Sequence, residues 1–455
     1  PFVEANYPVQ ADSKGRAVAG FSVGGGQTLN IGLTNTDKFA YVCSYAPYTA
    51  TDEFKKNFTD WSPNTEQLNK QLKLFSISIA TEDFLYESVK QNLAMFNEKN
   101  YGFYAGGDLV WIGIISFPVL AVLDSVAGRD YSVRKMNNAT LANIPIWLCA
   151  VGPVCLYFMA AWRIGQGDLT NAQLIGGLLS LAWMGVIPLV PAAHELYHMR
   201  GALPRTVGRY SHLCILDCTR DIGHVVGHHI DVATPDDGDT AARGTNLYTF
   251  TWGAFVESTM YAMKMEAGAL KKKGLSPFHI SHRVYPALLA LAIFHAIIFM
   301  IGGPLANLVA LGGQVLARFW VESFNYFQHY GVVRLKGAPI GRRHLWNHLG
   351  WFSRVMAFEI TNHADHHLNS YQVYYKLVPH KEAITMPSVF VCFLSALVPP
   401  LWHEAIIKPA LKRWDLEFAT VEERALAAKQ NEAAGWPDWQ HEQGAIVGKA
   451  ATVGV

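Results

Sequence analysis

Histidine is absent from the first 193 residues of this 455-residue chain, and all eighteen histidines lie between His194 and His441. A chain of this length has room for more than one domain. A single domain would rarely distribute one residue type so unevenly. We therefore expect two unlike parts, residues 1–100 and residues 101–445, followed by a short tail over residues 446–455.

Charged residues are also scarce. Asp, Glu, Lys and Arg make up 16% of the chain, compared with roughly 25% in ordinary soluble proteins, while apolar residues make up 51%. This composition favours a membrane protein. The net charge is only +1, so we expect no nucleic-acid partner.

Two further absences concern processing and redox chemistry. The six cysteines include no Cys-x-x-Cys pair, which favours buried, reduced thiols over a disulfide framework or a zinc site. The chain begins at Pro1 without a charged-then-apolar leader. We interpret it as a fragment or a processed product.

Long apolar runs fill much of the second part, and most approach the ~20 residues needed to cross a bilayer. They cover residues 109–126, 142–162, 174–193, 284–301 and 305–320, and a shorter run over 388–402 is typical of an interfacial segment. Gly302-Gly303-Pro304 is expected to break the fourth and fifth runs into a hairpin. The sequence predicts a mainly α fold, a polytopic transmembrane helical bundle.

Basic residues set the expected orientation of this bundle. Segments 194–283 and 321–387 are rich in Lys and Arg, whereas the loop between the second and third runs has only Arg163. Cytoplasmic loops carry the excess of positive charge. The two basic segments, which hold nearly all the histidines, are therefore expected to form a cytoplasmic cap.

The first part has an α/β pattern. A strand over residues 16–20 runs into Gly20-Phe21-Ser22-Val23-Gly24, and a helix is expected from Gln27. Gly-x-Ser-x-Gly after a strand is typical of a nucleophile elbow, in which the turn is too sharp for larger flanking side chains. This stretch resembles the feruloyl-esterase branch of the α/β-hydrolases.

A second strand from Leu74 to Ala80 leads to Asp83, which could supply the acid of a catalytic triad. A serine hydrolase also needs a histidine base after that acid. The next histidine is His194, which belongs to another pattern. We expect a truncated, inactive esterase-like segment, with Ser22 and Asp83 vestigial, joined by gene fusion or by an assembly artefact.

Histidines of the second part fall into four clusters. They are His194-Glu195-Leu196-Tyr197-His198, His224-Val225-Val226-Gly227-His228-His229, His329 alone, and His363-Ala364-Asp365-His366-His367. An i,i+4 pair places both imidazoles on one face of a helix, directed at one metal ion. The spacing therefore indicates metal binding.

Several kinds of metal protein could use such clusters. His-Glu-x-x-His alone is typical of a zinc peptidase, with Glu195 as general base. A metal carrier or transporter would also bind metal. Nine histidines, however, exceed the three protein ligands of a catalytic zinc site, and imidazole also suits iron. The pattern predicts two metal ions held by His194, His198, His224, His228, His229, His329, His363, His366 and His367.

Carboxylates among these clusters are candidates for orienting the ligand imidazoles by hydrogen bonds. The candidates are Glu195, Asp221, Asp231, Glu322 and Asp365. His344 and His348 form another i,i+4 pair, which we leave outside the ligand set because nine donors suffice. The remaining histidines lack paired spacing and are expected to be bystanders: His212, His279, His282, His295, His380, His403 and His441.

The four boxes closely resemble those of the membrane-bound alkane and xylene monooxygenases. The resemblance includes Thr234-Pro235 after the second box and Asn325-Tyr326…His329-Tyr330-Gly331, and it extends from Tyr101-Gly102-Phe103-Tyr104 to Ala434-Gly435-Trp436-Pro437. It looks strongest with the hydroxylases of xylene or toluene methyl groups and of p-cymene. It implies six transmembrane helices and a di-iron centre held by the nine histidines.

The resemblance also implies a function. It is the O2-dependent hydroxylation of the methyl group of an aromatic hydrocarbon such as toluene, xylene or p-cymene, in the bacterial inner membrane with the active site on the cytoplasmic side. Electrons would come from NADH through a separate iron–sulfur flavoprotein reductase or a ferredoxin. A small hydrophobic substrate would arrive through the lipid bilayer, along an apolar lining supplied by the third and fifth runs.

Two points remain open at this level. The family's first helix should lie just before Tyr101, where the esterase-like segment stands, so we expect that helix to be missing. A terminal alkane hydroxylase or a membrane fatty-acid desaturase or hydroxylase would use similar boxes. The Asn325-to-Gly331 motif argues against the desaturase.

Overall fold

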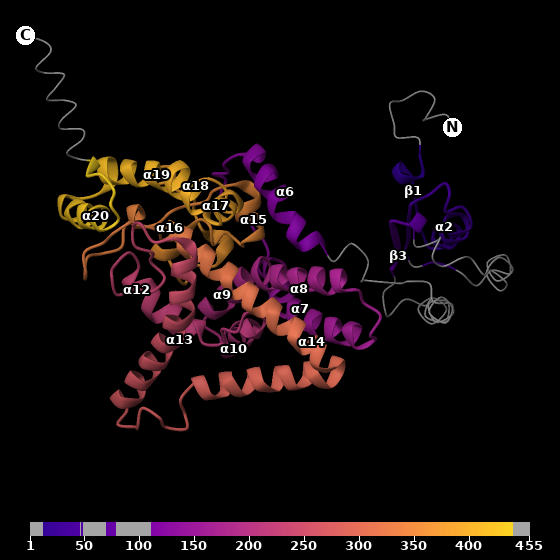
Figure 1. Cartoon of the computed structure of the whole chain (residues 1–455), viewed down its shortest axis with the longest axis horizontal. Coiled ribbons are helices and arrows are strands. Elements are labelled where there is room, and N and C mark those ends of the chain that lie inside the picture. Colours follow the sequence, from indigo (N-terminus) through magenta and orange to yellow (C-terminus); the bar gives the residue numbers. More distant parts are fainter. Residues whose placement is uncertain (1–11, 46, 49–69, 79–110, 440–455) are drawn as a thin grey trace, which may run out of the picture. The chain divides into compact units, whose positions relative to one another are not determined.

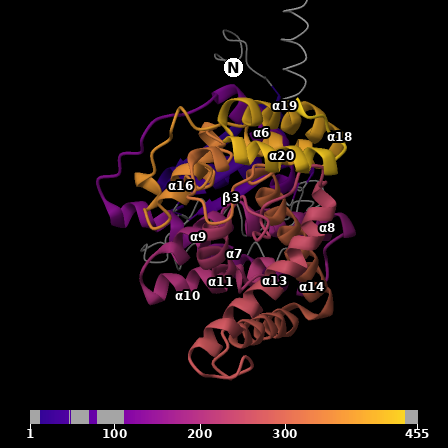
Figure 2. The same cartoon turned by 90° about the vertical axis from the view of Figure 1, so that its left-hand side faces the viewer.

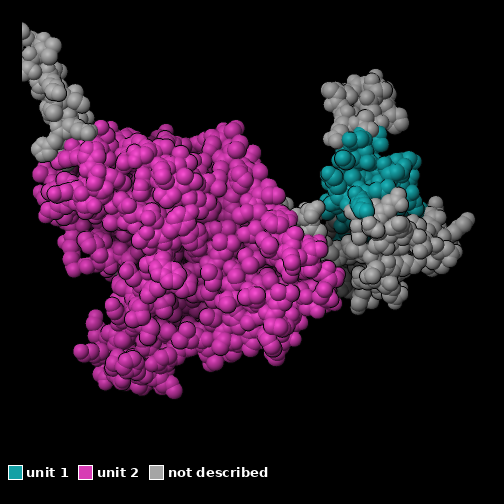
Figure 3. Space-filling view, in the orientation of Figure 1, with its two compact units in different colours: residues 1–105 teal, residues 106–455 magenta. Residues whose placement is uncertain are grey.

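The computed structural model describes residues 12–45, 47–48, 70–78 and 111–439. The chain divides into two compact units, residues 1–105 and residues 106–455, coloured separately in Figure 3. The division lies five residues after residue 100, the expected end of the first part. Each unit is described by itself.

The first unit contains a three-stranded parallel sheet in the order β1-β2-β3. Its described elements are β1 (Ala17–Phe21), α2 (Val23–Thr34), β2 (Tyr41–Tyr45) and β3 (Leu74–Ser78). The two predicted strands are present. The helix begins at Val23, four residues before the predicted Gln27, because the chain turns at a single residue, Ser22.

Ser22 has the strained backbone of a nucleophile elbow, with φ 56° and ψ −120°. The turn brings α2 very close to β1. A Cβ added to Gly20 would lie 2.2 Å from the carbonyl oxygen of Gly24, so only glycine fits there. The local geometry thus confirms the elbow, while Asp83 lies outside the described residues.

The second unit is helical (Figures 1 and 2). The helices of its apolar part are α6 (Ile112–Ala127), α7 (Ala139–Gly165), α8 (Asn171–Val186), α9 (Leu189–His198) and α14 (Val284–Gln328). Short helices α10 (Ala202–Ser211), α11 (Arg220–Gly223), α12 (His229–Asp231), α15 (Trp351–Met356) and α16 (His363–Leu368) surround the histidines. The longer α13 (Leu247–Lys272) precedes α14, and α17 (Val389–Ala396), α18 (Pro399–Leu401), α19 (Lys408–Arg413) and α20 (Val421–Ala433) end the described chain.

Three helical segments of the described chain are long and apolar enough to cross a membrane. They are Ala139–Gly165, Asn171–His198 and Val284–Gln328, and Gly113–Ala127 is a shorter apolar helix. Within the described residues, four of the predicted runs fall on the three long segments, and the first run overlaps the shorter helix. The run 388–402 forms the short α17 and α18, and the 26-residue α13 was not anticipated from its sequence.

Val284–Gln328 is two helices joined at a break. Gly303 has φ 74° and ψ −169°, which only glycine adopts readily, and Pro304 follows. A Cβ on Gly302 would lie 2.1 Å from the carbonyl oxygen of Ala161, so the break packs tightly on α7. Figure 1 shows the two arms diverging from this point, as the Gly-Gly-Pro sequence predicted.

Aromatic packing joins the helices beneath the histidines. The ring of Phe117 on α6 lies 4.3 Å from that of Trp183 on α8, 5.0 Å from Trp320 on α14 and 4.7 Å from Phe393 on α17. Aromatic pairs at such distances each add about 0.5–1.5 kcal/mol beyond area burial. The cluster fixes α8 and α14, which lead directly into two of the histidine segments.

The C-terminal helices and the far end of α13 lie on different sides of this bundle. In both views, α19 and α20 lie opposite the loop that joins α13 to α14 (Figures 1 and 2). Arg243 ties the C-terminal part to the segment before α13, through Asp415 at 2.6 Å and the carbonyl oxygen of Gly331 at 2.8 Å. These buried contacts hold the turn after α14, where His329 lies.

Candidate metal centre

Four separate segments bring nine histidines together. His194 and His198 lie on α9, His329 follows the last residue of α14, and the remaining six come from residues 224–229 and from α16. All nine are the residues predicted from spacing. They form two groups, in each of which one nitrogen per ring lies within 4.8 Å of every other.

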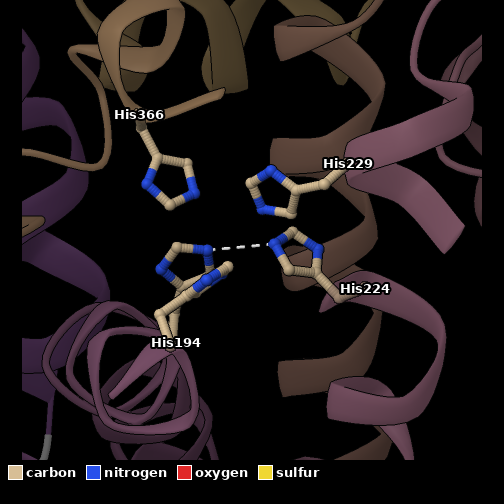
Figure 4. A group of neighbouring side chains, drawn as sticks. His194, His224, His229 and His366 are labelled. Atoms are coloured by element: carbon tan, nitrogen blue, oxygen red, sulfur yellow. Dashed lines mark hydrogen bonds between the residues drawn. The ribbon is translucent and has the colours of Figure 1, made fainter. Parts of the chain in front are cut away.

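The first histidine group contains His194, His198, His224, His229 and His366. Figure 4 shows rings from three different segments pointing toward a common centre. Nε2 of His194 lies 3.0 Å from Nε2 of His224, and the ring centroids of His194 and His366 are 4.6 Å apart. The group therefore gathers donor atoms from α9, the second cluster and α16.

The second histidine group contains His228, His329, His363 and His367. Nε2 of His363 lies 2.6 Å from Nε2 of His329 and 3.2 Å from Nε2 of His367. His363 and His367 are related by i,i+4 on α16, so their rings share a face. His366, which lies between them in sequence, belongs to the first group.

A π-helical turn distributes the histidines of the second cluster. Residues His224–His228 form this turn, in which hydrogen bonds run from i to i+5. The wider turn brings His229 beneath His224, so both join the first group, while His228 joins the second. A regular α-helix would place i+4 there instead, and π-turns occur often at functional sites.

Burial leaves many ring nitrogens of these histidines without partners. All nine are at most 8% exposed. Both nitrogens of His198 and of His229, Nε2 of His228 and of His366, and Nδ1 of His224 and of His367 have no hydrogen-bond partner among the described residues. Unpaired buried polar atoms are costly, and bound cations remove that cost. The donor sets fit two metal ions that accept imidazole, a class that includes iron.

The protonation state of the histidine rings also favours metal binding. Burial, followed by repulsion from neighbouring imidazoles, holds the pKa of His224, His229 and His366 well below the usual value. Burial likewise lowers the pKa of His363 and His367. These rings are therefore neutral at physiological pH, which is the form that ligates metals.

Hydrogen bonds to Nδ1 fix three rings of the second group. Nδ1 of His228 lies 3.0 Å from both carboxylate oxygens of Asp237. Burial lowers the pKa of His228, but Asp237 and Asp239 outweigh it and raise that pKa above its usual value. Backbone carbonyl oxygens of Asn325 and Ile360 accept from Nδ1 of His329 and His363, each at 3.1 Å. Each contact directs Nε2 into the group.

Four of the five carboxylates predicted to orient the histidines have other partners in the structure. Asp221 binds Arg209, and Glu322 binds Arg220 and Arg318. Asp365 accepts from His380 at 2.9 Å, and Glu195 accepts from the backbone N–H of Tyr374 at 3.1 Å. Among the described residues, none of the five, Asp231 included, is hydrogen-bonded to the nine histidines.

Sequence reasoning missed Asp237 and Asp239, the carboxylates that do face His228. Both follow Thr234-Pro235 in a turn dense with aspartate, a signal that would have pointed to them. His344 and His348 lie outside both groups, as expected. Nε2 of His344 lies 2.8 Å from Glu423, and Nδ1 of His348 donates to the carbonyl oxygen of Pro387 at 2.7 Å.

An apolar cavity of about 70 Å³ opens between the two groups. His194 and His224 of the first group and His329 and His363 of the second line one side. Most of the remaining wall is apolar, from the third run as expected, from the end of α14 beyond the fifth run, and from α17: Val186, Ile187, Val190, Val321, Phe324, Val389 and Phe390. No described residue of the fifth run itself lines the cavity, and polar side chains such as Arg220, Asn325 and Thr361 also do. The cavity gives an apolar molecule access to both groups.

Comparison with known protein families defines the class. The fatty acid desaturase family matches residues 170–386, which include all nine histidines. The esterase family matches residues 1–94. The second unit is therefore a histidine-rich membrane enzyme with a desaturase-like fold, preceded by an esterase-like segment.

Individual relatives narrow this class to monooxygenases. The chain is 42% identical to the xylene/toluene monooxygenase hydroxylase component of Pseudomonas putida over 341 residues, which cover 74% of this chain and 92% of the relative. It is 31% identical to alkane 1-monooxygenase 1 of Pseudomonas aeruginosa, covering 70% and 86%, and 26% identical to an alkane 1-monooxygenase of Pseudomonas putida, covering 73% and 85%. The chain belongs to this family of membrane-bound monooxygenases.

Proposed function

We propose that the chain hydroxylates the methyl group of a small aromatic hydrocarbon, of the toluene, xylene or p-cymene type, at a di-iron centre. One observation carries the proposal: two buried histidine groups face the same apolar cavity. The 42% identity to a xylene/toluene monooxygenase component supports the aromatic substrate. The overall reaction consumes O2, two electrons and two protons, and yields an alcohol and water.

The nine histidines would hold the two ions, five in the first group and four in the second. Iron bound there would supply the activation of O2, because side chains alone carry no such redox chemistry. Nδ1 contacts with Asp237, Asn325 and Ile360 would keep three of the rings in their ligating orientation. The protein thus contributes a prearranged set of imidazoles.

The cavity would select and position the substrate. Val321 and Phe324 of α14 and Phe390 of α17 contact whatever enters, and these side chains form no hydrogen bonds to a ligand. An apolar wall excludes water, which would otherwise compete with the hydrocarbon for the space beside the histidines. A methyl group without polar handles is therefore held by shape and by van der Waals contact.

The orientation and the electron supply are part of the proposal. The segments with an excess of Lys and Arg would face the cytoplasm of a bacterial inner membrane, which places the histidine groups near that side. Electrons would come from NADH through a separate iron–sulfur flavoprotein reductase or a ferredoxin. The hydrocarbon would enter from the bilayer, in which it dissolves.

The test is a product assay with the full chain. Membranes that contain the chain and a co-expressed reductase are given NADH with toluene, p-xylene, p-cymene or octane, and alcohols are quantified by gas chromatography. We expect benzylic alcohols and NADH-dependent O2 uptake. Preferential formation of 1-octanol would assign the chain to terminal alkane hydroxylation instead. Zinc without iron in the purified protein would contradict the di-iron centre.

A further inference from the structure

A second, larger cavity of about 640 Å³ also reaches the histidine groups. His224 and Arg220 line both this cavity and the apolar one, and so form the wall between them. Residues between 217 and 245 and the part of α13 from Thr249 to Lys264 enclose the rest. We call it the acidic cavity because six carboxylates line it, against two cationic side chains: Asp217, Asp231, Asp236, Asp237, Asp239 and Glu257, against Arg220 and Lys264.

Several of these charges are paired, but a negative excess remains. Asp217 forms ion pairs with Arg220 and Arg318, and Asp236 pairs with Lys336. Asp231 and Glu257 form no ion pair among the described residues. A cleft lined by one sign of charge concentrates counter-ions and raises their association rate by 10–10³-fold. This cavity therefore attracts cations, whereas the apolar cavity excludes them.

The inner end of the acidic cavity holds a third set of donor atoms. One nitrogen each of His224 and His228 and a carboxylate oxygen of Asp239 lie within 4.8 Å of one another. Nδ1 of His224 is buried without a hydrogen-bond partner among the described residues. Figure 4 shows the other ring nitrogen of His224, Nε2, directed at His194, with Nδ1 on the far side of the ring.

From this arrangement we infer that the acidic cavity is the access route for the divalent metal ions. An arriving ion halts at His224, His228 and Asp239. It then passes to the two histidine groups, because His224 belongs to the first and His228 to the second. The inference rests on the proposed metal centre and goes beyond it, since it names how that centre is filled.

Two glycines of α13 allow a matched test of the route. Gly253 lines the acidic cavity, and Gly268 lies on the same helix outside it; an added Cβ meets nothing within 4 Å at either position. The Cβ of Gly253→Leu therefore meets no clash and its side chain narrows the cavity, and Gly268→Leu is the control. Metal-free protein, prepared by chelation, is mixed anaerobically with Fe²⁺ or Co²⁺, and uptake is followed by stopped-flow absorption and by metal analysis at the end point.

We expect Gly253→Leu to slow metal uptake on the order of 10-fold, with the same final metal content as the unmodified chain. Gly268→Leu should load at the unmodified rate. Uptake by Gly253→Leu at the unmodified rate would overturn the access route. Failure of the unmodified chain to bind metal would overturn both the route and the metal centre, so the two failures are distinguishable.

A charge test does not depend on filling the cavity. The double variant Asp231→Asn/Glu257→Gln removes the two carboxylates without ion pairs, and Glu404→Gln is the control outside the cavity. We expect slower uptake only in the double variant, together with a weaker dependence of the rate on salt, because screening weakens electrostatic attraction. An unchanged rate and salt dependence would reject guidance by the cavity.

Discussion

The ring of His229 in the first histidine group stacks on the ring of His367 in the second, with 4.4 Å between their centroids. The two groups are therefore in direct contact. In each of two segments, sequence neighbours belong to different groups: His229 and His366 to the first, and His228 and His367 to the second. A shift of either backbone segment would displace ligands of both metal sites together, so we expect the two ions to be bound and lost as a unit.

Single substitutions of the ligands should reveal this coupling. His198→Ala, His228→Ala, His329→Ala and His367→Ala each remove one donor from a buried site, and each should abolish hydroxylation and lower iron content by more than one ion's share. Iron analysis of the purified variants checks this. His279→Ala, in the loop between α13 and α14, is the control. Full iron and activity in three of the four variants would show that the ligand assignment is wrong.

Histidine spacing predicted the nine residues that gather in the two groups. Two metal ions need many imidazoles, and i,i+4 pairs such as His194 and His198 are readable in one dimension. The break at Gly303 was readable for a similar reason, since Gly-Gly-Pro cannot continue a helix. Both predictions rested on patterns that are local in the sequence.

Other features depend on packing and could not be read in this way. The carboxylate of Glu322 lies near the histidines in sequence, but Arg318 and Arg220 hold it. Asp237 reaches His228 only because the chain folds back after the π-turn, which no propensity announces. The choice between His366 and His367 as members of the first or second group likewise follows from the placement of α16.

The contact between Asp237 and His228 predicts that removal of the Asp237 carboxylate lowers metal affinity. Asp237→Ala removes the acceptor at Nδ1 and frees the ring to turn, so metal affinity should fall by about 10–100-fold. Competition with a coloured chelator measures it. Glu417→Ala is the control, because the carboxylate of Glu417 pairs with Arg413 at the surface, outside the acidic cavity. Equal affinities in the two variants would contradict an orienting role for Asp237.

The lowered pKa values predict that the metal-free protein is labile to acid. Burial lowers the folded-state pKa of His224, His229, His329, His363, His366 and His367 below the ordinary value of 6.5. Below pH 6.5 the unfolded chain therefore binds protons that the folded chain does not. The free energy of unfolding falls as the pH drops, by up to about 1.4 kcal/mol per pH unit for each such histidine.

His228 and Asp239 oppose this trend, since the pKa of each is raised, but they are two groups against the six histidines named. Thermal unfolding of the chelated protein in detergent, between pH 7.5 and pH 5.5, measures the balance. The melting temperature should decrease steadily toward the lower pH. A melting temperature that stays constant or rises would contradict burial of neutral histidines.

We predict that the first unit does not hydrolyse esters, although Ser22 lies on a nucleophile elbow. Its strained turn is in place, but the chain contains no histidine before His194, and a serine without a base is a poor nucleophile. Hydrolysis of p-nitrophenyl acetate by the purified chain should be the same for the unmodified protein and for Ser22→Ala. A rate that Ser22→Ala abolishes would show that the first unit is an active esterase.

We expect the side chain of Phe324 to determine which substrates fit the apolar cavity. Its ring lines the cavity beside His329, and it also lies 5.1 Å from the ring of Phe327. Phe324→Ala enlarges the cavity, which removes contacts to a small ligand and makes room for a larger one. Turnover of p-cymene relative to toluene should therefore rise on the order of 10-fold, within the range that a change in an apolar pocket produces.

Competition between the two substrates, with both alcohols quantified from one reaction, measures that ratio directly. Phe299→Ala is the control, because Phe299 lies on the first arm of α14, is 53% exposed and does not line the cavity. An unchanged ratio in Phe324→Ala, with iron content intact, would mean that substrates reach the histidine groups from another direction. The apolar cavity would then have to be abandoned as the binding site, although the ligand assignment would stand.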